Sequence, residues 1–349
     1  MKKVLFFVQG NIGGAEKITL RISNSLDKSN YNIKYVLFSM NNTNEFPLAS
    51  LLNDTDDTIN IPRLSTWRYI YTIFRILRKE KPDIVFSSTF FIAAKLLLLR
   101  HLFRKVKFIV RCEHNPSKFT EKQRRILKLT YRNADTIIAQ TEEMNSELRS
   151  VLNNKENIIT LTNPVSSTIK DKANEYNPYD NVSSPVFVAV GRFNPVKGFD
   201  LLIEAFRHYI DLHQIGTLYI VGDYSGINES YFEQVKELVD RYQLSAVVHF
   251  PGFKLNPYPF IKNADCFVLS SRSEGLPNVM LESLLLGTPV ASFSCVPIIN
   301  SIICEEVNGY TVNNGDTLAL AEAMYCASNL GRVKSTFLTS TIEDFIKLF

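Results

Sequence analysis

Short, continuously apolar runs alternate with helix-length segments twice along the chain, and this alternation limits the possible folds more than any other feature. Because the runs are apolar throughout rather than at every second position, they indicate parallel strands covered by helices on both faces. In the first half we expect strands at 3–8, 33–38, 83–88, 107–112, 135–140 and 157–162. Helix-length segments lie between several of them, at 15–28, 67–80, 90–103 and 119–133.

A polar segment at 166–184 interrupts the alternation and is typical of a linker. The alternation then resumes, with strands expected at 185–191, 217–222, 247–252, 265–271 and 288–293. Helices are expected near 198–212, 229–243, 257–263, 277–286 and 316–328. A chain of 349 residues also suits two domains. The sequence therefore predicts an α/β protein with two doubly wound sheets, whose strand carboxyl ends line a ligand-binding cleft.

The cysteines and the apolar stretches argue against several classes of protein. Five cysteines show no metal-binding spacing, so we expect free thiols in a reducing cytosol and no metal site. Only five apolar residues follow Lys2 and Lys3, so we expect no secretory signal. The stretch at 90–103 is interrupted by Lys95 and Arg100 and is too short to span a bilayer.

Charge is distributed unevenly along the chain. Residues 1–170 contain 27 basic and 15 acidic residues, whereas residues 171–349 contain 12 and 20. The basic excess is concentrated at 62–132, where 18 basic residues accompany 4 acidic ones. Such a segment suits an anionic membrane or a nucleic acid, or it is a merely solvated face. Because no nucleic-acid-reading motif is present, we expect no nucleic-acid partner.

The loop "NIGGAEK" at 11–17 lies between an apolar run and a helical pattern. Its glycines match neither the dinucleotide fingerprint nor the phosphate-binding loop of P-loop nucleotide-binding proteins. A strand that leads through glycines into a helix usually presents backbone amides to an anion. We expect Gly13 and Gly14 to let the backbone approach a phosphate, the alternative being a plain tight turn.

Two acidic residues flank the start of a predicted helix in "SSRSEGLPNVMLESLLLGTPVAS", residues 270–292. Glu274 lies in the loop before the helix, and Pro277 stands where the helix begins. Glu282 lies inside the helix among apolar neighbours. The amides at the helix start suit a phosphate, and the two carboxylates can accept hydrogen bonds from sugar hydroxyls. The alternative is a loop acid and a solvated helix acid.

Two cations follow another predicted strand, in "VGRFNPVKGFDLLIEAF", residues 190–206. Arg192 and Lys197 lie in one short loop, and Gly198 permits a turn. Asp200 is a candidate helix cap. The two cations can contact one diphosphate and stabilise negative charge on a leaving phosphate. The alternative is a pair of solvated loop cations.

With these motifs the chain resembles glycosyltransferase family 4, retaining transferases of the GT-B fold, in which two Rossmann-like domains face each other across a cleft. The resemblance covers nearly the whole chain and rests on "NIGGAEK", "EHN" at 113–115, "TNPV" at 162–165, "GRFNPVKG", "YIVGD" at 219–223, "NADCFVLSSRSEGLPNVMLES" and "LGTPV". It implies an acceptor-side domain at 1–165, a linker at 166–184, a nucleotide-sugar-binding domain at 185–335 and a final helix at 336–349 that packs back on the first domain.

The resemblance implies a role for each matching residue. Arg192 and Lys197 match the pair that binds the donor diphosphate. Glu274 matches the acid that contacts the hydroxyls of the donor sugar, and His114 matches the histidine that leans over that sugar. These four are the expected catalytic residues. The other expected donor-binding residues are Glu282, which holds the ribose, and Gly13, Gly14, Gly222, Gly275, Leu276 and Asn278.

Two departures from the family pattern lie on the donor side and put the donor sugar in doubt. The family often has a second glycine after the Glu-Gly pair, where this chain has Pro277 and Asn278. After the strand at 217–221 the glycines are Gly222 and Gly226 rather than a closer pair. The first departure resembles bacterial transferases that build surface polysaccharides and lipid-linked oligosaccharides, some of which use N-acetylhexosamine donors.

The resemblance implies a retaining transferase that moves a hexose or N-acetylhexosamine from a nucleotide-diphosphate sugar, above all a UDP-sugar. The acceptor is a saccharide or an undecaprenyl-linked sugar of bacterial surface polysaccharide biosynthesis, and no cofactor or metal is needed. The segment 62–132 would hold this cytoplasmic protein on the inner face of the plasma membrane, with 90–107 lying shallowly in the interface. The alternative for 90–107 is a buried helix followed by an exposed basic turn.

Three other functions stay open at this point. A nucleotide-sugar 2-epimerase shares the architecture, and product analysis without an acceptor would identify it. A non-catalytic GT-B subunit predicts a degraded donor site, whereas the donor-site motifs are present here. A nucleic-acid-binding protein that acts through its basic segment would show salt-dependent binding.

Overall fold

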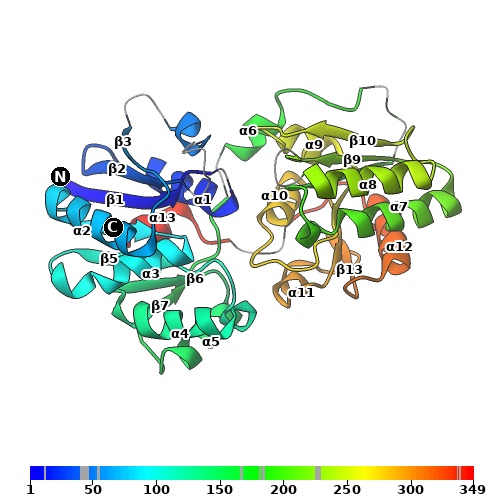
Figure 1. The fold of residues 1–349 in the computed structure, drawn as a ribbon. Helices are drawn as coiled ribbons and strands as arrows, with labels where there is room; N and C mark the ends of the chain where they lie inside the picture. Colours follow the sequence, from blue (N-terminus) through cyan, green and yellow to red (C-terminus); the bar gives the residue numbers. More distant parts are fainter. Residues whose placement is uncertain are drawn as a thin grey trace. The chain divides into compact units, whose positions relative to one another are not determined.

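The protein consists of two compact units, each built on one parallel sheet (Figure 1). The first comprises Met1–Pro164 and Thr339–Phe349, and the second comprises Val165–Leu338. The structure is a computed structural model that describes residues 1–11, 13–39, 47–52, 56–165, 168–180, 182, 185–224, 229–335, 337 and 339–349. The predicted pair of doubly wound α/β sheets is confirmed.

The first unit has seven strands in the order β3–β2–β1–β4–β5–β6–β7. The strands are β1 (Lys2–Gln9), β2 (Tyr31–Phe38), β3 (Asp57–Ile61), β4 (Ile84–Ser87), β5 (Lys107–Arg111), β6 (Thr136–Ala139) and β7 (Ile158–Thr160). One face is covered by α2 (Thr66–Glu80), α3 (Phe90–Leu98), α4 (Glu121–Thr130) and α5 (Glu142–Val151). The other is covered by α1 (Gly14–Asn24) and α13 (Ile342–Ile346). Both faces of β1 are therefore buried, which explains its continuous apolar sequence.

The second unit has six strands in the order β10–β9–β8–β11–β12–β13. They are β8 (Val186–Val190), β9 (Thr217–Val221), β10 (Val248–Gly252), β11 (Cys266–Leu269), β12 (Val290–Phe293) and β13 (Gly309–Val312). One face carries α7 (Phe199–His213), α8 (Glu229–Arg241) and α12 (Thr317–Ser328). The other carries α6 (Ile169–Ala173), α9 (Tyr258–Asn263), α10 (Asn278–Leu286) and α11 (Ile298–Ile302).

The segment 166–184 differs from the expected linker wherever the structure describes it. It contains α6, and Ile169, Ala173 and Tyr179 are buried in the core of the second unit. The hydroxyl of Tyr179 donates a hydrogen bond to the carbonyl of Phe260 (2.8 Å). Three widely spaced apolar residues were enough to anchor this segment, although its overall composition is polar.

The segment 90–107 was predicted either to lie in a membrane interface or to form a buried helix followed by an exposed basic turn, and the structure shows a helix that is buried on one side, with Phe91 and Leu98 exposed. In α3, Ala93 and Leu97 are fully buried against the sheet. Arg104 and Lys105 follow in an exposed turn.

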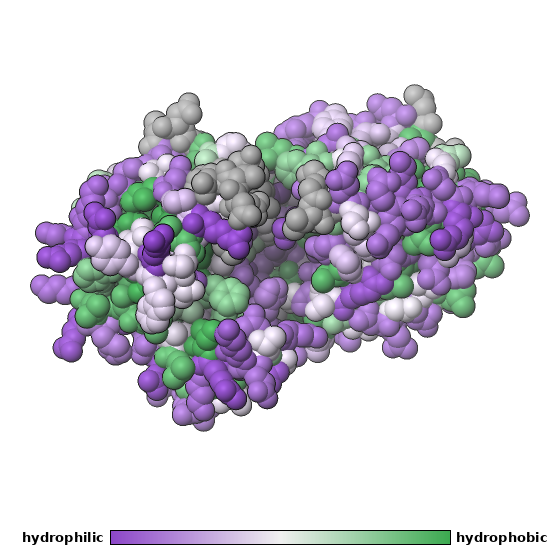
Figure 2. Space-filling model, in the orientation of Figure 1, coloured by the Kyte–Doolittle hydropathy of each residue, from purple (hydrophilic) through white to green (hydrophobic). Residues whose placement is uncertain are grey.

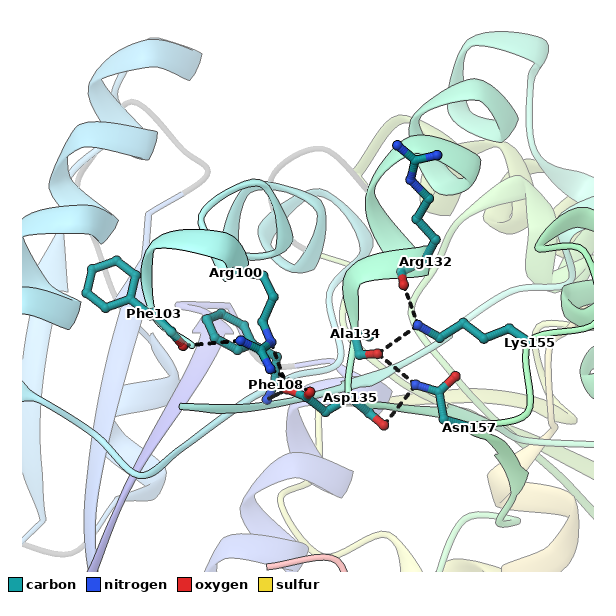
Figure 3. A network of polar contacts seen from close by, with 8 residues as sticks. All are labelled: Arg100, Phe103, Phe108, Arg132, Ala134, Asp135, Lys155 and Asn157. Atoms are coloured by element: carbon teal, nitrogen blue, oxygen red, sulfur yellow. Dashed lines mark hydrogen bonds and ion pairs between the residues drawn. The ribbon is translucent and has the colours of Figure 1, made fainter. Parts of the chain in front are cut away.

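A polar network holds the amino ends of β5, β6 and β7 together (Figure 3). The carboxylate of Asp135 accepts two hydrogen bonds from Arg100 (3.0 and 2.8 Å) and one from the amide of Phe108 (2.7 Å). Asn157 donates to the carbonyls of Ala134 (2.7 Å) and Asp135 (2.8 Å). This edge of the sheet is thus occupied by structural contacts, and the opposite edge carries the loops that concern function.

The end of the chain completes the core of the first unit. Phe345 and Phe349 are buried beside β1, and the ring of Phe349 lies 5.7 Å from that of Phe6. Lys2 donates to the carbonyl of Phe349 (2.6 Å). The last eleven residues therefore belong to the first unit by packing as well as by hydrogen bonding.

Candidate active site

In the second unit the chain changes its direction of winding at β8. This strand pairs with β9 on one side and with β11 on the other. The segments that follow β8 and β11 therefore begin side by side at the carboxyl ends of the strands. In doubly wound sheets, ligands bind at such a switch point, beyond the carboxyl ends of the strands. The predicted residues Arg192, Lys197 and Glu274 all lie in these two segments.

Lys197 and Glu274 form an ion pair between the two segments. The Nζ atom of Lys197 lies 2.7 Å from Oε1 of Glu274, and the hydroxyl of Ser271 donates to the same oxygen (2.7 Å). The two side chains are 27% and 13% exposed. The pair is therefore shielded on most sides but still accessible to a ligand.

A further contact, which was not predicted, holds the two segments together. The amide of Arg272 donates to the carbonyl of Val196 (2.7 Å), and its guanidinium donates to the carbonyl of Pro195 (2.7 Å). The guanidinium also makes two bonds, of 2.8 and 2.6 Å, to the carboxylate of Asp200. Partial burial raises the pKa of Asp200, but hydrogen bonds from Arg272 and Tyr231 outweigh it and leave that pKa below its usual range.

Asp200 is not the cap of α7, as the sequence had led us to expect. The N-cap position is occupied by Gly198 in the left-handed region, at φ +64°, and Asp200 lies in the first turn, where it binds Arg272 instead. A Cβ atom on Gly198 would lie 3.1 Å from the carbonyl carbon of Ser270 and overlap its oxygen. Gly198 thus provides both the turn and the close approach between the segments.

The start of α10 lies at the end of the segment after β11. Pro277 occupies the N-cap position, and its own side chain provides no capping hydrogen bond. The amides at a helix N-terminus attract an anion. Gly275 and Asn278 are partly buried here, whereas the side chain of Leu276 packs in the core.

Glu282 lies one turn further along α10 and is only 9% exposed. The hydroxyl of Tyr258 donates to its Oε1 atom (3.2 Å). The alternative of a solvated helix acid is therefore wrong for Glu282. Its bond from Tyr258 shows that this buried carboxylate accepts from a hydroxyl, so the residue is a candidate for binding hydroxyl groups.

Arg192 has a different environment from Lys197. It is exposed, and its side chain makes no hydrogen bond or ion pair with any residue that the structure describes. An exposed cation in the same loop as Lys197 can reorient toward a ligand without breaking an existing contact.

Gly222, a predicted donor-binding residue, has an internal reason to be glycine. It follows β9, and its amide donates to the carbonyl of Gly252 (3.1 Å). A Cβ atom there would lie 2.8 Å from the carbonyl carbon of Gly191 and overlap its oxygen. Gly222 therefore allows the ends of β8 and β9 to approach. Gly226 and Ile12, also part of the predicted motifs, lie outside the described residues.

In the first unit, Gly13 and Gly14 form the start of α1. Gly13 is the N-cap in extended backbone, and Gly14 is the first helical residue. The carboxyl carbon of Glu16 would lie 3.5 Å from a Cβ atom on Gly13. The carboxylate of Glu16 thus folds back over the helix start, in the space that a side chain on Gly13 would occupy.

His114 lies on an exposed turn directly after β5. Its neighbour Glu113 is partly buried. Burial above all, together with the charge of Glu16, raises the pKa of Glu113 to about 8, although the charge of Arg111 opposes the rise. The turn after β5 and the start of α1 therefore meet at the same edge of the first sheet, as parallel topology requires.

Metal-binding clusters and membrane-spanning helices are both missing from the described part of the chain. No group of three His, Cys, Asp or Glu residues there is placed to hold a metal ion. Among the same residues, every helix is too short or too polar to cross a membrane.

Comparison with known proteins gives two family matches that together span most of the chain. Residues 12–168 match the model described as Glycosyltransferase Family 4, and residues 172–329 match the model described as Glycosyl transferases group 1. The loops of the first unit and the Lys197–Glu274 pair of the second fall inside these matches.

Individual proteins show the same relationship. An uncharacterized glycosyltransferase of Methanocaldococcus jannaschii is 31% identical over 68% of this chain and 62% of its own length. The lipopolysaccharide core biosynthesis glycosyltransferase LpsD of Rhizobium meliloti is 27% identical over 92% of this chain and 87% of its own. A crystal structure of Anabaena HepE in complex with UDP and glucose is 17% identical, covers 100% of this chain and 98% of its own, and has a TM-score of 0.79. The chain thus belongs to the glycosyltransferases, with a Family 4 domain followed by a group 1 domain.

Proposed function

We propose that this glycosyltransferase transfers a sugar from a UDP-sugar to a saccharide or lipid-linked saccharide acceptor, with retention of the anomeric configuration. The observation that carries the proposal is the Lys197–Glu274 ion pair at the switch point of the second sheet, in the segment that leads into the start of α10. It combines a cation, helix amides and an acceptor of hydroxyl hydrogen bonds in one place.

The donor diphosphate would compete with Glu274 for Lys197. A diphosphate carries more charge than one carboxylate and can also bind the first amides of α10. Once Lys197 turns to the phosphates, Glu274 keeps its bond from Ser271 and has a free oxygen for the hydroxyls of the donor sugar. Arg192 would add a second cation, and Glu282 would accept bonds from the ribose.

The reaction would follow a front-face course. The bond between the anomeric carbon and the diphosphate oxygen breaks, and the acceptor oxygen bonds to the same face of that carbon. The acceptor proton passes to the departing phosphate oxygen, so no enzyme base is required. Lys197, Arg192 and the start of α10 would stabilise the leaving diphosphate, and His114 would approach the donor sugar. No metal or cofactor takes part in this scheme.

Two of the relatives support this choice of substrates. HepE was crystallised with UDP and glucose, and LpsD is named for lipopolysaccharide core biosynthesis. A UDP-sugar donor and a bacterial surface saccharide as acceptor are therefore the substrates to test first.

The slow hydrolysis of UDP-glucose, UDP-galactose and UDP-N-acetylglucosamine by the protein, followed by proton NMR, tests the proposal without knowledge of the acceptor. We expect one of these donors to release UDP and a sugar that is first seen as the α anomer. A first product in the β form would contradict retention. Formation of a 2-epimer would instead indicate an epimerase, and three unconsumed donors would indicate a non-catalytic subunit.

For the acceptor side, we propose that the protein works in the cytoplasm on the inner face of the plasma membrane. Within the segment 62–132, we propose α2 as the helix that contacts the membrane surface. Trp67 and Tyr71 are 80% and 62% exposed on this helix. Its other exposed side chains include Arg68, Arg75, Arg78 and Lys79. The acid of the helix, Glu80, is engaged by Lys3 and Lys34. In Figure 2, apolar and hydrophilic residues are mixed over the part of the first unit where Figure 1 places α2 and α3.

Reversing two charges on α2 should release the protein from anionic vesicles. Each basic residue near such a surface contributes ~1 kcal/mol, so the double substitution Arg75→Glu with Arg78→Glu should weaken partitioning more than about tenfold. The measurement is co-sedimentation with vesicles of phosphatidylglycerol and phosphatidylcholine at low salt. Leu212→Ser, at a 71% exposed residue of the second unit, is the control. Unchanged sedimentation of the double variant would exclude α2 as the contact.

A further inference from the structure

Three buried polar side chains form a continuous hydrogen-bond network behind the turn that carries His114. They are Arg111 at the end of β5, Gln140 after β6 and Asn163 after β7, and they are 2%, 3% and 2% exposed. The guanidinium of Arg111 donates to Oδ1 of Asn163. The amide of Asn163 donates to Oε1 of Gln140 (3.1 Å).

Gln140 then binds the turn itself. Its Nε2 atom donates to the carbonyls of Cys112 (2.8 Å) and Glu113 (3.0 Å), the two residues before His114. The thiol of Cys112 donates to the carbonyl of His114 (3.3 Å). The turn is thus held by the side chain of Gln140 from behind, while His114 itself is exposed.

Arg111 fixes the order of donors and acceptors in this hydrogen-bond network. A guanidinium has only donors, so the oxygen of Asn163 must face it and the NH₂ group must face Gln140. Gln140 must in turn present its oxygen to Asn163 and its NH₂ group to the two carbonyls. Because all three side chains are buried, a reversed amide would leave like groups facing each other without water to separate them.

We propose that Gln140 and Asn163 are positioning residues for His114, with their orientation set by Arg111. The proposal rests on the proposed function, in which His114 approaches the donor sugar. It assigns a role to residues outside the donor site of the second unit, because their contacts determine where the backbone of the turn lies.

The same hydrogen-bond network connects the turn to the place where the polypeptide leaves the first unit. Asn163 directly precedes Pro164, whose carbonyl accepts a hydrogen bond from Arg21. Its other neighbour, Thr162, exchanges hydrogen bonds with Ser340 on the returning segment (2.9 Å from the amide of Thr162). The His114 turn and both connections to the second unit are therefore anchored on one set of contacts.

A double-mutant cycle separates positioning from a general loss of stability. Gln140→Leu removes the donors to the turn. Asn163→Asp keeps the acceptor for Arg111 but removes the donor to Gln140 with little change in volume. Each should lower kcat for UDP release from the donor about tenfold. In a His114→Ala background the same changes should lower kcat by less than about twofold, because the group that they position is absent.

The control is Asn145→Ala. Asn145 is another buried amide of the first unit, which donates to Thr160 (2.8 Å) and accepts from Arg149 (2.8 Å) away from the turn. It should lower the melting temperature and leave kcat unchanged. Gln140→Leu and Asn163→Asp should also leave UDP affinity unchanged. If Gln140→Leu and His114→Ala lowered kcat independently, so that their fold-changes multiplied in the double variant, the proposal would be overturned.

A second readout does not depend on turnover. The imidazole Cε1 proton of His114 can be assigned in an NMR spectrum by its disappearance in His114→Ala. Gln140→Leu and Asn163→Asp should shift this resonance, and Asn145→Ala should not. An unmoved resonance overturns the positioning role even if the protein is active. Absence of activity toward every UDP-sugar, together with a moved resonance, would reject the proposed function and keep the structural link.

Discussion

Replacing Lys197 with alanine is expected to lower kcat for release of UDP from the donor by about 10²–10³-fold. In the proposed reaction Lys197 stabilises charge that develops on the leaving diphosphate, and loss of one such preorganised group costs ~2.7–4 kcal/mol of transition-state stabilisation. In the ligand-free protein the same side chain pairs with Glu274, which retains its bond from Ser271 after the substitution. A partly exposed ion pair contributes little to folding, so the variant should remain folded.

The matched control is Lys236→Ala, because Lys236 is an exposed lysine on α8 of the same unit. It should leave both kcat and the melting temperature unchanged. If Lys197→Ala turned over the donor as fast as the wild-type protein, the ion pair would be only a structural link between two loops. A melting temperature that is lower in Lys197→Ala but not in Lys236→Ala, with kcat unchanged in both, would point to the same conclusion.

Replacing Gly222 with alanine is expected to destabilise the second unit by about 3 kcal/mol, the upper end of the usual cost of overpacking. The added Cβ atom would overlap the carbonyl oxygen of Gly191, and backbone cannot move aside as a flexible side chain would. For a unit of this size, that cost corresponds to a fall in melting temperature of about 6–12 °C. Differential scanning calorimetry measures it directly.

Gly315→Ala serves as the control for this prediction. Gly315 has φ +88° and nothing within 4 Å of an added Cβ atom, so its replacement tests backbone strain without overlap. That strain should cost about 1–2 kcal/mol, less than the overlap at Gly222. A Gly222→Ala protein of normal stability that had lost affinity for UDP would show that the glycine serves ligand approach instead.

The sequence predicted the interior strands well for a physical reason. Interior strands are buried on both faces and so have continuous apolar sequences, as in β1 and β8. Two of the four edge strands, β3 and β13, were missed because they lack that pattern: three of the five residues of β3 are exposed. The short helix α6 was missed because only its two end residues, Ile169 and Ala173, are buried.

The candidate site was predicted in part. Lys197 and Glu274 could be identified from their positions after two strands, but their direct pairing could not, because it depends on β8 and β11 being neighbours. The partner of Asp200 was misjudged for the same reason, since Arg272 lies in the segment that strand order places beside it. The link from Gln140 to the turn that carries His114 likewise joins residues from separate strands. Contacts of this kind follow from topology rather than from local sequence.

The most direct test of the account is calorimetric titration of UDP, GDP and ADP into the wild-type protein, Lys197→Ala and Lys236→Ala. We predict that UDP binds at one site in the wild-type protein, that GDP and ADP bind far more weakly, and that Lys197→Ala weakens UDP binding more than about tenfold while Lys236→Ala does not. Absence of nucleotide binding, or equal affinity in the wild-type protein and Lys197→Ala, would contradict the claim that the switch point of the second sheet is the donor site.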